Sequence, residues 1–302
     1  MSLIVILGPT AVGKTQLAVQ LATELEGEII SADSRQVYRE MDLGTGKDLK
    51  EYLVNGKQVP YHLIDIKQAG EAYSVFDFQQ DFYKAYESII GKSKTAILCG
   101  GTGLYIEAAL AKEKMQEVPK NTLLRKELET LSQEELNVRL IDLTQSIHNS
   151  TDLTNRERTI RAIEIVLYTS QHTEVQLSPV KEFKLIGLRM EREKLRKRIG
   201  ERLKVRLQNG MIEEVQQLLS RGVTHEQLSY YGLEYRFLSS YIQGHVGYDE
   251  MFEGLVQAIR RFAKKQMTWY RRMEKHGQMI HWIDAEEPMD VKIQQALKLA
   301  TK

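Results

Sequence analysis

Short apolar runs alternate with amphipathic segments along the first part of the chain. Several runs have the length and the β-branched or leucine-rich composition of buried parallel strands: residues 3–7 (LIVIL), 27–30 (GEII), 62–66 (HLIDI), 95–100 (TAILCG) and 184–190 (KLIGLRM). Residues 15–25 (TQLAVQLATEL) carry apolar positions at helical spacing. Strands that alternate with helices predict an α/β fold, with a parallel sheet covered by helices on both faces.

The pattern changes in the middle of the chain. Residues 113–180 are rich in charge and helical in period, and the sequence offers no convincing strand there. We therefore predict a helical domain inserted into a core formed by residues 1–112 and 181–302. The chain is again almost wholly helical from residue 191 to about 275, and residues 278–284 (QMIHWID) predict one late strand. The C-terminal part of the core is therefore expected to be mainly helical.

Composition and charge narrow the class of protein. The 302 residues include 42 Lys or Arg against 41 Asp or Glu, a formal net charge of +1, and 42% are hydrophobic, as in a soluble globular protein. A single cysteine, Cys99, excludes an internal disulfide framework and a cysteine-based metal cluster, and its apolar surroundings predict burial. The apolar start is too short for a signal peptide, and no run approaches the roughly 18 apolar residues of a membrane span. We expect a cytoplasmic monomer with no membrane partner.

A phosphate-binding loop follows the first predicted strand. The sequence GPTAVGKT matches G-x-x-x-x-G-K-[ST] between a strand and a helix, which is the context that the motif requires. Its glycines let backbone amides surround an anion at the start of a helix, its lysine adds a charge, and its last hydroxyl can ligate Mg2+. We therefore predict a P-loop NTPase-like core that binds a diphosphate or triphosphate at Gly8, Pro9, Thr10, Ala11, Val12, Gly13, Lys14 and Thr15, with Mg2+ on Thr15.

The loop alone does not identify the reaction. A nucleotide hydrolase would need a second apolar strand that ends in an acidic Mg2+ ligand. Asp65 follows one predicted strand, but the run at 95–100 ends in glycines. A small-molecule kinase that uses ATP would place arginines on a helical lid, and Arg158 and Arg161 lie in the insertion. Those arginines are equally consistent with a solvated helix face.

Polar residues crowd into the stretch ISADSRQVY, directly after the second predicted strand. Asp33 would project from the carboxyl edge of the sheet, where ligands of open α/β folds bind. Gln36 can make the paired donor and acceptor contacts that a base edge requires, and Tyr38 can stack or hydrogen-bond. Thr102, in the later stretch GGTG, would face the same crevice. A capped turn would also explain the polar cluster, but three strand-end loops at one edge favour a ligand site.

Positive charge is concentrated in two predicted helices. Residues 191–206 carry eight Lys or Arg against three Glu, and residues 260–275 carry seven against one. Apolar residues at four-residue spacing predict one core-facing side of the first helix, at Leu195, Ile199, Leu203 and Leu207. Arg198 and Arg202 lie beside that side, within reach of a neighbouring site. Two basic helices on a nearly neutral chain favour a nucleic-acid partner over plain solubilising charge.

The chain resembles the bacterial tRNA dimethylallyltransferases over nearly its whole length. It carries, in that family's order, the motifs GPTAVGKT, SADSRQVY, YHLID, YSVFDFQQDF, GGTGLY, NRERTIRAIEI, REKLRKRIGERL and AKKQMTWYRR. The resemblance implies an enzyme that transfers a dimethylallyl group from dimethylallyl diphosphate to N6 of adenosine 37, beside the anticodon of tRNA. It also implies that the inserted helical domain grips the anticodon stem-loop.

The same resemblance implies roles for particular residues. The phosphate loop would hold the diphosphate, with Lys14 and Arg198 as cations and Mg2+ as cofactor, and Thr102 would lie at the reacting centre. Asp33 would accept the proton of the adenine amine. The residues implied to contact tRNA are Asp33, Ser34, Arg35, Gln36 and Thr102 in the core, and Arg125, Glu157, Arg158, Thr159, Ile160 and Arg161 in the insertion.

The chain departs from this family's pattern in two places. Tyr61 and His62 stand where His-His usually precedes Leu-Ile-Asp, and the stretch Gly-Leu-Glu at 232–234 stands where many members have Gly-Tyr followed by Arg or Lys. The preference among tRNAs could differ accordingly. Three rival classes stay open: a small-metabolite kinase, a tRNA-binding protein without activity, and an adenylate prenyltransferase that acts on free nucleotide. The basic helices and the absence of a clear second acidic strand end count against the first, Asp33 and Thr102 count against the second, and the large basic insertion counts against the third.

Overall fold

The computed structural model describes residues 3–111, 113–144, 153–172 and 180–300. The chain forms two compact units: residues 1–110 together with 180–302, and residues 111–179. These bounds lie within two residues of those predicted for the core and the insertion. Each unit is described by itself.

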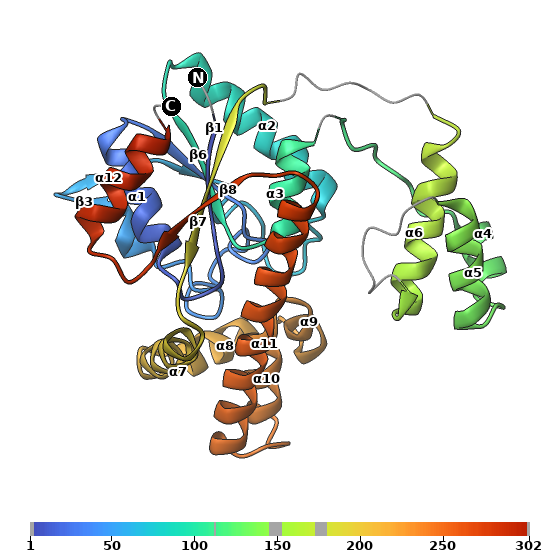
Figure 1. The fold of residues 1–302 in the computed structure, drawn as a ribbon. Helices are drawn as coiled ribbons and strands as arrows, with labels where there is room; N and C mark the ends of the chain where they lie inside the picture. The colour runs from blue at the N-terminus through green and yellow to red at the C-terminus, as the bar shows by residue number, and fades with distance from the viewer. Residues whose placement is uncertain (1–2, 112, 145–152, 173–179, 301–302) are drawn as a thin grey trace. The chain divides into compact units, whose positions relative to one another are not determined.

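The larger unit is built on a six-stranded sheet in which every recorded strand pairing is parallel (Figure 1). In order across the sheet, the strands are β5 (Tyr61–His62), β2 (Glu28–Ser31), β6 (Ala96–Gly100), β1 (Leu3–Leu7), β7 (Phe183–Arg189) and β8 (Ile280–Asp284). The central strands β1, β2 and β6 are buried along their whole length, as their continuous apolar sequences predict. The predicted α/β fold is confirmed, and so is the late strand near the C-terminus.

Helices cover both faces of this sheet. Figure 1 shows α1 (Lys14–Glu24) and α12 (Met289–Ala300) on one side and α2 (Val75–Gly91) and α3 (Gly103–Leu110) on the other. Leu17 and Leu21 of α1 pack on Ile4 and Ile6 of β1 in a buried apolar cluster. A short helix η1 (Leu49–Tyr52) and a small hairpin of β3 (Leu53–Val54) and β4 (Lys57–Gln58) lie between β2 and β5 in the chain. This layering brings the loops after β1, β2 and β6 to one carboxyl edge.

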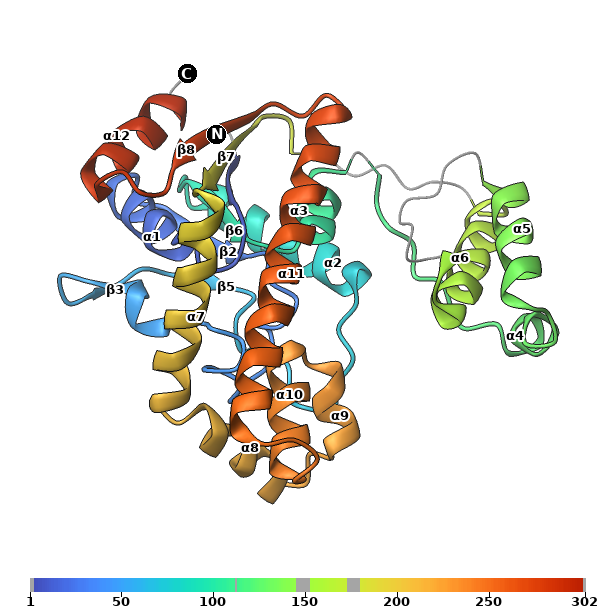
Figure 2. The ribbon, with the colours of Figure 1, turned by 60° about the horizontal axis from the view of Figure 1, so that its bottom comes forward.

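The C-terminal helices pack along one another within the same unit. They are α7 (Arg192–Gln208), α8 (Met211–Ser220), α9 (His225–Tyr230), α10 (Leu233–Ile242) and the long α11 (Tyr248–Lys275), which Figure 2 shows side by side. The predicted apolar side of α7 is buried. None of the described helices is long and apolar enough to cross a membrane.

The smaller unit is a cluster of α4 (Thr122–Leu128), α5 (Gln133–Leu143) and α6 (Arg156–Thr169). Each helix begins at a side-chain cap, and the caps are Asn121, Ser132 and Asn155. Its core holds Leu128, Leu136, Leu140, Ile160 and Ile163. The predicted helical character of the insertion is confirmed within the part of it that the structure describes.

One strand prediction was mostly wrong. Of residues 62–66, only His62 belongs to a strand, because β5 ends there. Leu63 and Asp65 have φ values of 62° and 56°, which are left-handed conformations that a strand cannot contain. Asp65 is pulled into a turn by an ion pair with buried Lys47. The apolar run was therefore the end of a strand followed by a polar turn.

Candidate active site

The phosphate loop has the backbone that its glycines predict. Gly13 caps α1 with φ 94°, in the left-handed region. A Cβ on Gly8 would lie 2.6 Å from the carbonyl oxygen of Leu188, so only glycine fits there. The Lys14 Nζ donates to the carbonyl oxygen of Pro9 at 2.8 Å. Burial lowers the pKa of Lys14 to about 8, because it disfavours the charged form. An anion beside Lys14 would favour that form.

Helix α11 joins the phosphate loop to the glycine-rich loop after β6. Gln266 accepts from the Thr10 amide at 2.8 Å and donates to the Gly101 carbonyl at 2.9 Å. The Tyr270 hydroxyl donates to the Gly8 carbonyl at 3.0 Å. Two glycine loops are thus fixed against each other by one buried helix face. The Thr10 amide is already engaged, so the predicted anion site depends on the other amides of the loop.

The stretch after β2 forms a tight polar turn. One carboxylate oxygen of Asp33 accepts from the Arg35 amide at 2.9 Å, and the Ser34 amide donates to the Thr102 hydroxyl at 3.3 Å. The Gln36 side chain accepts from the Ser31 hydroxyl at 3.1 Å and donates to the Gly46 carbonyl at 3.4 Å. Its amide orientation is therefore fixed, with one N–H left for a ligand.

Tyr38, which the sequence suggested could stack or hydrogen-bond, is buried and does not line the pocket. Tyr38 is only 1% exposed and packs edge-on against Tyr231 of the segment that follows α9, with ring centroids 4.7 Å apart. Cys99 is buried, as predicted. The apolar burial raises the pKa of its thiol to about 12, so it is an inert neighbour of the site.

These loops enclose one polar pocket. From the phosphate loop and the stretch after β2, the pocket is lined by Thr10, Ala11, Gly13, Lys14, Thr15, Asp33 and Gln36. Arg198 and Arg202 of α7 close another side, as their place beside the apolar face predicted. Thr102 does not line the pocket, but its hydroxyl accepts from the amide of Ser34, the residue after Asp33. Of the four predicted catalytic residues, three share the pocket and the fourth supports its wall.

Two carboxylates in the pocket were not foreseen from the sequence. Asp48 pairs with Arg202, which also donates to the Gly46 carbonyl at 3.3 Å. Glu51 lies further along the same wall, and burial followed by the neighbouring charge of Asp48 raises its pKa. Both residues follow a turn with no recognised motif, so their proximity to the phosphate loop depends on how residues 42–48 fold back.

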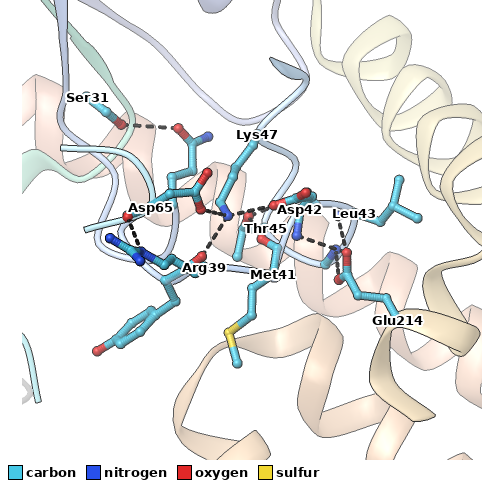
Figure 3. A network of polar contacts seen from close by, with 12 residues as sticks. Ser31, Arg39, Met41, Asp42, Leu43, Thr45, Lys47, Asp65 and Glu214 are labelled. Atoms are coloured by element: carbon cyan, nitrogen blue, oxygen red, sulfur yellow. Dashed lines mark hydrogen bonds and ion pairs between the residues drawn. The ribbon is translucent and has the colours of Figure 1, made fainter. Parts of the chain in front are cut away.

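A network of polar contacts fixes that turn (Figure 3). Lys47 is 0% exposed, and its Nζ donates to the Tyr38 carbonyl at 2.6 Å, to Asp42 at 2.7 Å and to Asp65. Glu214 of α8 accepts from the amides of Asp42, Leu43 and Gly44 at 2.9, 2.7 and 2.8 Å. Figure 3 shows the Glu214 carboxylate facing these amides. The tight run DLGTGK was the only sequence signal of this turn, and nothing local pointed to Glu214.

The inserted unit uses most of its predicted tRNA contacts for its own structure. Arg125 donates to both oxygens of buried Glu164 at 2.8 and 2.7 Å, and Arg161 donates to the same carboxylate at 3.1 Å. Burial opposes ionisation, but these hydrogen bonds lower the pKa of Glu164 to about 2. The side chains of Thr159 and Ile160 are buried. Direct side-chain contact by these two residues is therefore not supported.

Glu157 and Arg158, by contrast, are exposed at the start of α6. The backbone amide of Arg158 donates to the Asn155 side chain at 3.1 Å, and the exposed Arg158 belongs to the first turn of the helix. In the stretch NRERTIR, Glu157 and Arg158 are therefore exposed, whereas Arg161 helps to hold the helical unit together.

Both departures from the family pattern lie in structural contacts. The Tyr61 ring packs edge-on against Tyr52, with centroids 4.8 Å apart, while His62 Nε2 lies 2.8 Å from Glu28 Oε2. Glu234 faces Arg206, with oxygen and nitrogen 3.6 Å apart. In this chain the two stretches therefore build the core around the site.

The fold and the pocket define an α/β protein with a P-loop-like turn after its first strand and a polar pocket beside that turn. The sequence model of the IPP transferase family matches residues 36–273, and the chain belongs to that family of transferases. It is similar to tRNA dimethylallyltransferase 2 of Bacteroides fragilis, with 52% identity over 96% of this chain and 95% of the relative. It is also similar to tRNA dimethylallyltransferase 1 of Geotalea uraniireducens, with 48% identity over 99% and 97%.

Solved structures agree with this assignment. The tRNA isopentenylpyrophosphate transferase of Bacillus halodurans aligns with a TM-score of 0.69 and 32% identity over 100% of this chain and 99% of that one. A eukaryotic dimethylallyltransferase acting on tRNA aligns with a TM-score of 0.79 over 98% of this chain and 78% of that one, at 23% identity. The second likeness concerns the fold alone.

Proposed function

We propose that this protein transfers the dimethylallyl group of dimethylallyl diphosphate to N6 of adenosine 37 in the anticodon loop of tRNA. Membership of the transferase family and the names of its relatives support this activity. The observation that carries it is the pocket itself, which brings Lys14, Arg198 and Asp33 together. The two cations suit a diphosphate, and the carboxylate suits an amine that must lose a proton.

The leaving group would bind at the phosphate loop. As the allylic C–O bond breaks, negative charge develops on the diphosphate, and preorganised amides and cations stabilise it. Lys14 and Arg198 are the cations placed for this, and Ala11, Gly13 and Thr15 of the phosphate loop line the same pocket. Diphosphate binding would also favour the charged form of Lys14, which burial disfavours.

The donor set of the pocket also suits Mg2+. The ion prefers hydroxyl, carboxylate and phosphate oxygens, and Thr15, Asp48 and Glu51 bring such oxygens to one wall. Among the described residues, no group of three or more His, Cys, Asp or Glu forms a metal cluster of its own, so the diphosphate would complete the coordination. Bound there, Mg2+ would neutralise charge on the departing diphosphate.

The acceptor base would meet Asp33 and Gln36. N6 of adenine attacks the allylic carbon, the N–C bond forms as the C–O bond breaks, and the amine loses one proton. One oxygen of Asp33 is engaged by the Arg35 amide, which leaves the other to take that proton. The Thr102 hydroxyl accepts from the Ser34 amide and would so hold the turn that carries Asp33. The target base must leave the loop stack to reach this depth.

Binding of the tRNA would use charge outside the pocket. The basic faces of α7 and α11 belong to the same unit as the site, and Glu157 and Arg158 are exposed on the inserted unit. Phosphate contacts of this kind supply affinity that falls steeply with salt. We expect the enzyme to act as a cytoplasmic monomer.

Incubation with unmodified tRNA and labelled dimethylallyl diphosphate, with AMP and ATP as alternative acceptors, tests the proposal. We expect prenylated adenosine in tRNA, detected by mass spectrometry of the digested product. Label in AMP or ATP would indicate an adenylate prenyltransferase, and ATP-dependent phosphoryl transfer would indicate a kinase.

The Asp33→Asn variant tests the proton acceptor separately. Asparagine keeps the shape and one acceptor oxygen but cannot take the proton, so single-turnover transfer should fall by roughly two to four orders of magnitude. Diphosphate binding should be retained. A rate near that of the unchanged protein would reduce Asp33 to a positioning residue.

A further inference from the structure

A half-exposed tyrosine lies beside the polar turn that follows β2. Tyr230, the last residue of α9, is 53% exposed. The guanidinium carbon of Arg35 lies 5.2 Å from the centroid of its ring. Arg35 in turn is held by the contact of its amide with Asp33, the residue assigned to the proton. Segments almost two hundred residues apart thus place an aromatic ring and a guanidinium next to the turn that carries Asp33.

Tyr230 is supported from behind by buried rings. It packs edge-on against Tyr231, with centroids 5.5 Å apart and planes at 83°. Tyr231 is 3% exposed, packs against Tyr38, and its hydroxyl accepts from the Gly70 amide. A ring fixed in this way can be stacked upon with little further loss of side-chain freedom. Isolated exposed aromatics are common on proteins, but this one has a rigid mount at the edge of the site.

The chemistry of this surface fits an unstacked nucleobase. Aromatic rings and guanidinium planes stack on bases of any sequence, because every base has a π face. When the target adenine leaves the anticodon-loop stack, the bases on either side of it each lose a stacking partner. A planar surface beside Asp33 can replace that partner and hold the loop with the target base turned inward.

We propose that Tyr230, with Arg35, forms a stacking platform for a base that flanks the target adenosine. The inference rests on the proposed function, because it needs an RNA loop from which one base is extruded. It assigns stacking on the RNA to a residue from the C-terminal helices rather than to the buried Tyr38. It also gives the stretch SYYGLE a part in tRNA recognition that does not depend on the family's usual Tyr-Arg or Tyr-Lys.

The test compares single-turnover transfer to an anticodon stem-loop RNA by Tyr230→Ala, Tyr230→Phe and a control, Tyr248→Ala. Tyr248 is also exposed, at 44%, but packs against Tyr241 at the far end of α11. At subsaturating RNA, Tyr230→Ala should lower transfer by about five- to 150-fold, the range for losing one stacked base. Tyr230→Phe keeps the ring and should stay close to the unchanged protein, as should Tyr248→Ala. Binding of dimethylallyl diphosphate should be the same in all four proteins.

Stem-loops with an abasic nucleotide on the 5′ or the 3′ side of the target adenosine identify the stacked base. One of the two abasic RNAs should slow the unchanged protein as much as Tyr230→Ala does, and should slow Tyr230→Ala little further. Transfer by Tyr230→Ala at the unchanged rate, or abasic effects that multiply in full with the substitution, would overturn the platform while leaving the activity intact. If the unchanged protein itself prenylates no RNA, the proposed function fails, and the platform fails with it.

Discussion

Replacing Glu214 by glutamine should release the turn at residues 42–48. The carboxylate accepts four hydrogen bonds: one oxygen takes the amides of Asp42 and Leu43, and the other takes the Gly44 amide and the Tyr235 hydroxyl at 2.8 Å. If the oxygen that takes two amides becomes the NH2 group, two contacts become donor facing donor. If the other oxygen does, the Gly44 amide loses its acceptor, while the Tyr235 hydroxyl can turn to accept. Each charge-assisted bond contributes roughly 1.5–3 kcal/mol, and water can replace part of the loss at an exposed turn. We therefore expect the free energy of local opening to fall by about 2–4 kcal/mol.

Hydrogen exchange of the backbone amides in residues 42–48 measures this opening. A loss of 2–4 kcal/mol corresponds to about 30- to 1000-fold faster exchange, since 1.4 kcal/mol is about tenfold. The matched control is Glu213→Gln, which removes the same charge from an exposed neighbour in the same helical turn and should change stability by under about 0.5 kcal/mol. Similar exchange in the two variants would refute the role assigned to Glu214.

The same variant tests whether the turn serves the chemistry. Gly46 lines the pocket and accepts from Gln36, so a mobile turn should misplace the adenine-reading amide. Transfer at saturating substrates should slow by about tenfold or more, because small misplacements are costly in pre-organised sites. Faster exchange with an unchanged transfer rate would show that the network stabilises the turn without positioning the substrate.

Three further predictions concern other contacts. Burial alone would raise the pKa of Glu28, but hydrogen bonds from His62, Lys94 and Lys92 lower it from 4.5 to about 2. The stabilisation by this carboxylate is therefore complete above pH 4.5 and is lost as the pH falls toward 2. In urea titrations across that window, the unfolding free energy of Glu28→Gln should change by about 3 kcal/mol less than that of the unchanged protein. Arg158→Ala should reduce tRNA affinity without changing thermal stability, and the slope of log K against log[salt] should become shallower by about one. Arg125→Ala should instead destabilise the helical unit by about 1–3 kcal/mol, and the reverse pattern would contradict the assignment. Gln266→Leu should slow transfer about tenfold or more by unpairing the Thr10 amide and the Gly101 carbonyl, and wild-type kinetics would refute that link.

Local patterns predicted the parts of the site that local chemistry decides. The apolar pattern determines the strand before Gly8 and the helix that begins at Lys14, and the loop between them needs glycine. The position and conformation of the phosphate loop could therefore be predicted from the sequence. Asp33 was placed correctly at the sheet edge because parallel strands end together. The conformation of residues 62–66 could not be predicted, because their turn depends on an ion pair with Lys47 from another loop.

Charge patterns were the weaker guide. The sequence pattern of a basic helix is the same whether its arginines face RNA or a buried carboxylate. In the structure, Arg125 and Arg161 pair with Glu164. The sequence likewise does not distinguish an exposed aromatic ring that can stack on a ligand from a buried ring that packs in the core. Tyr38 was expected to touch the substrate but is buried, while Tyr230, distant in sequence, is exposed beside Arg35. Pairings across such separations carry no periodic signal.

The C-terminal helices explain why the sheet alone would not make a site. Four loops that follow strands of the sheet are held by a residue from α8–α11 or the segment between α9 and α10. Gln266 holds the two glycine loops, Glu214 holds the 42–48 turn, and Tyr231 holds the loop before α2. The backbone donors and acceptors in these loops have no strand partners, so without the helices they would be left to water. The pocket can therefore acquire its fixed geometry only when the last part of the chain has packed. Substitutions far from the phosphate loop in sequence should for this reason impair transfer as strongly as substitutions beside it.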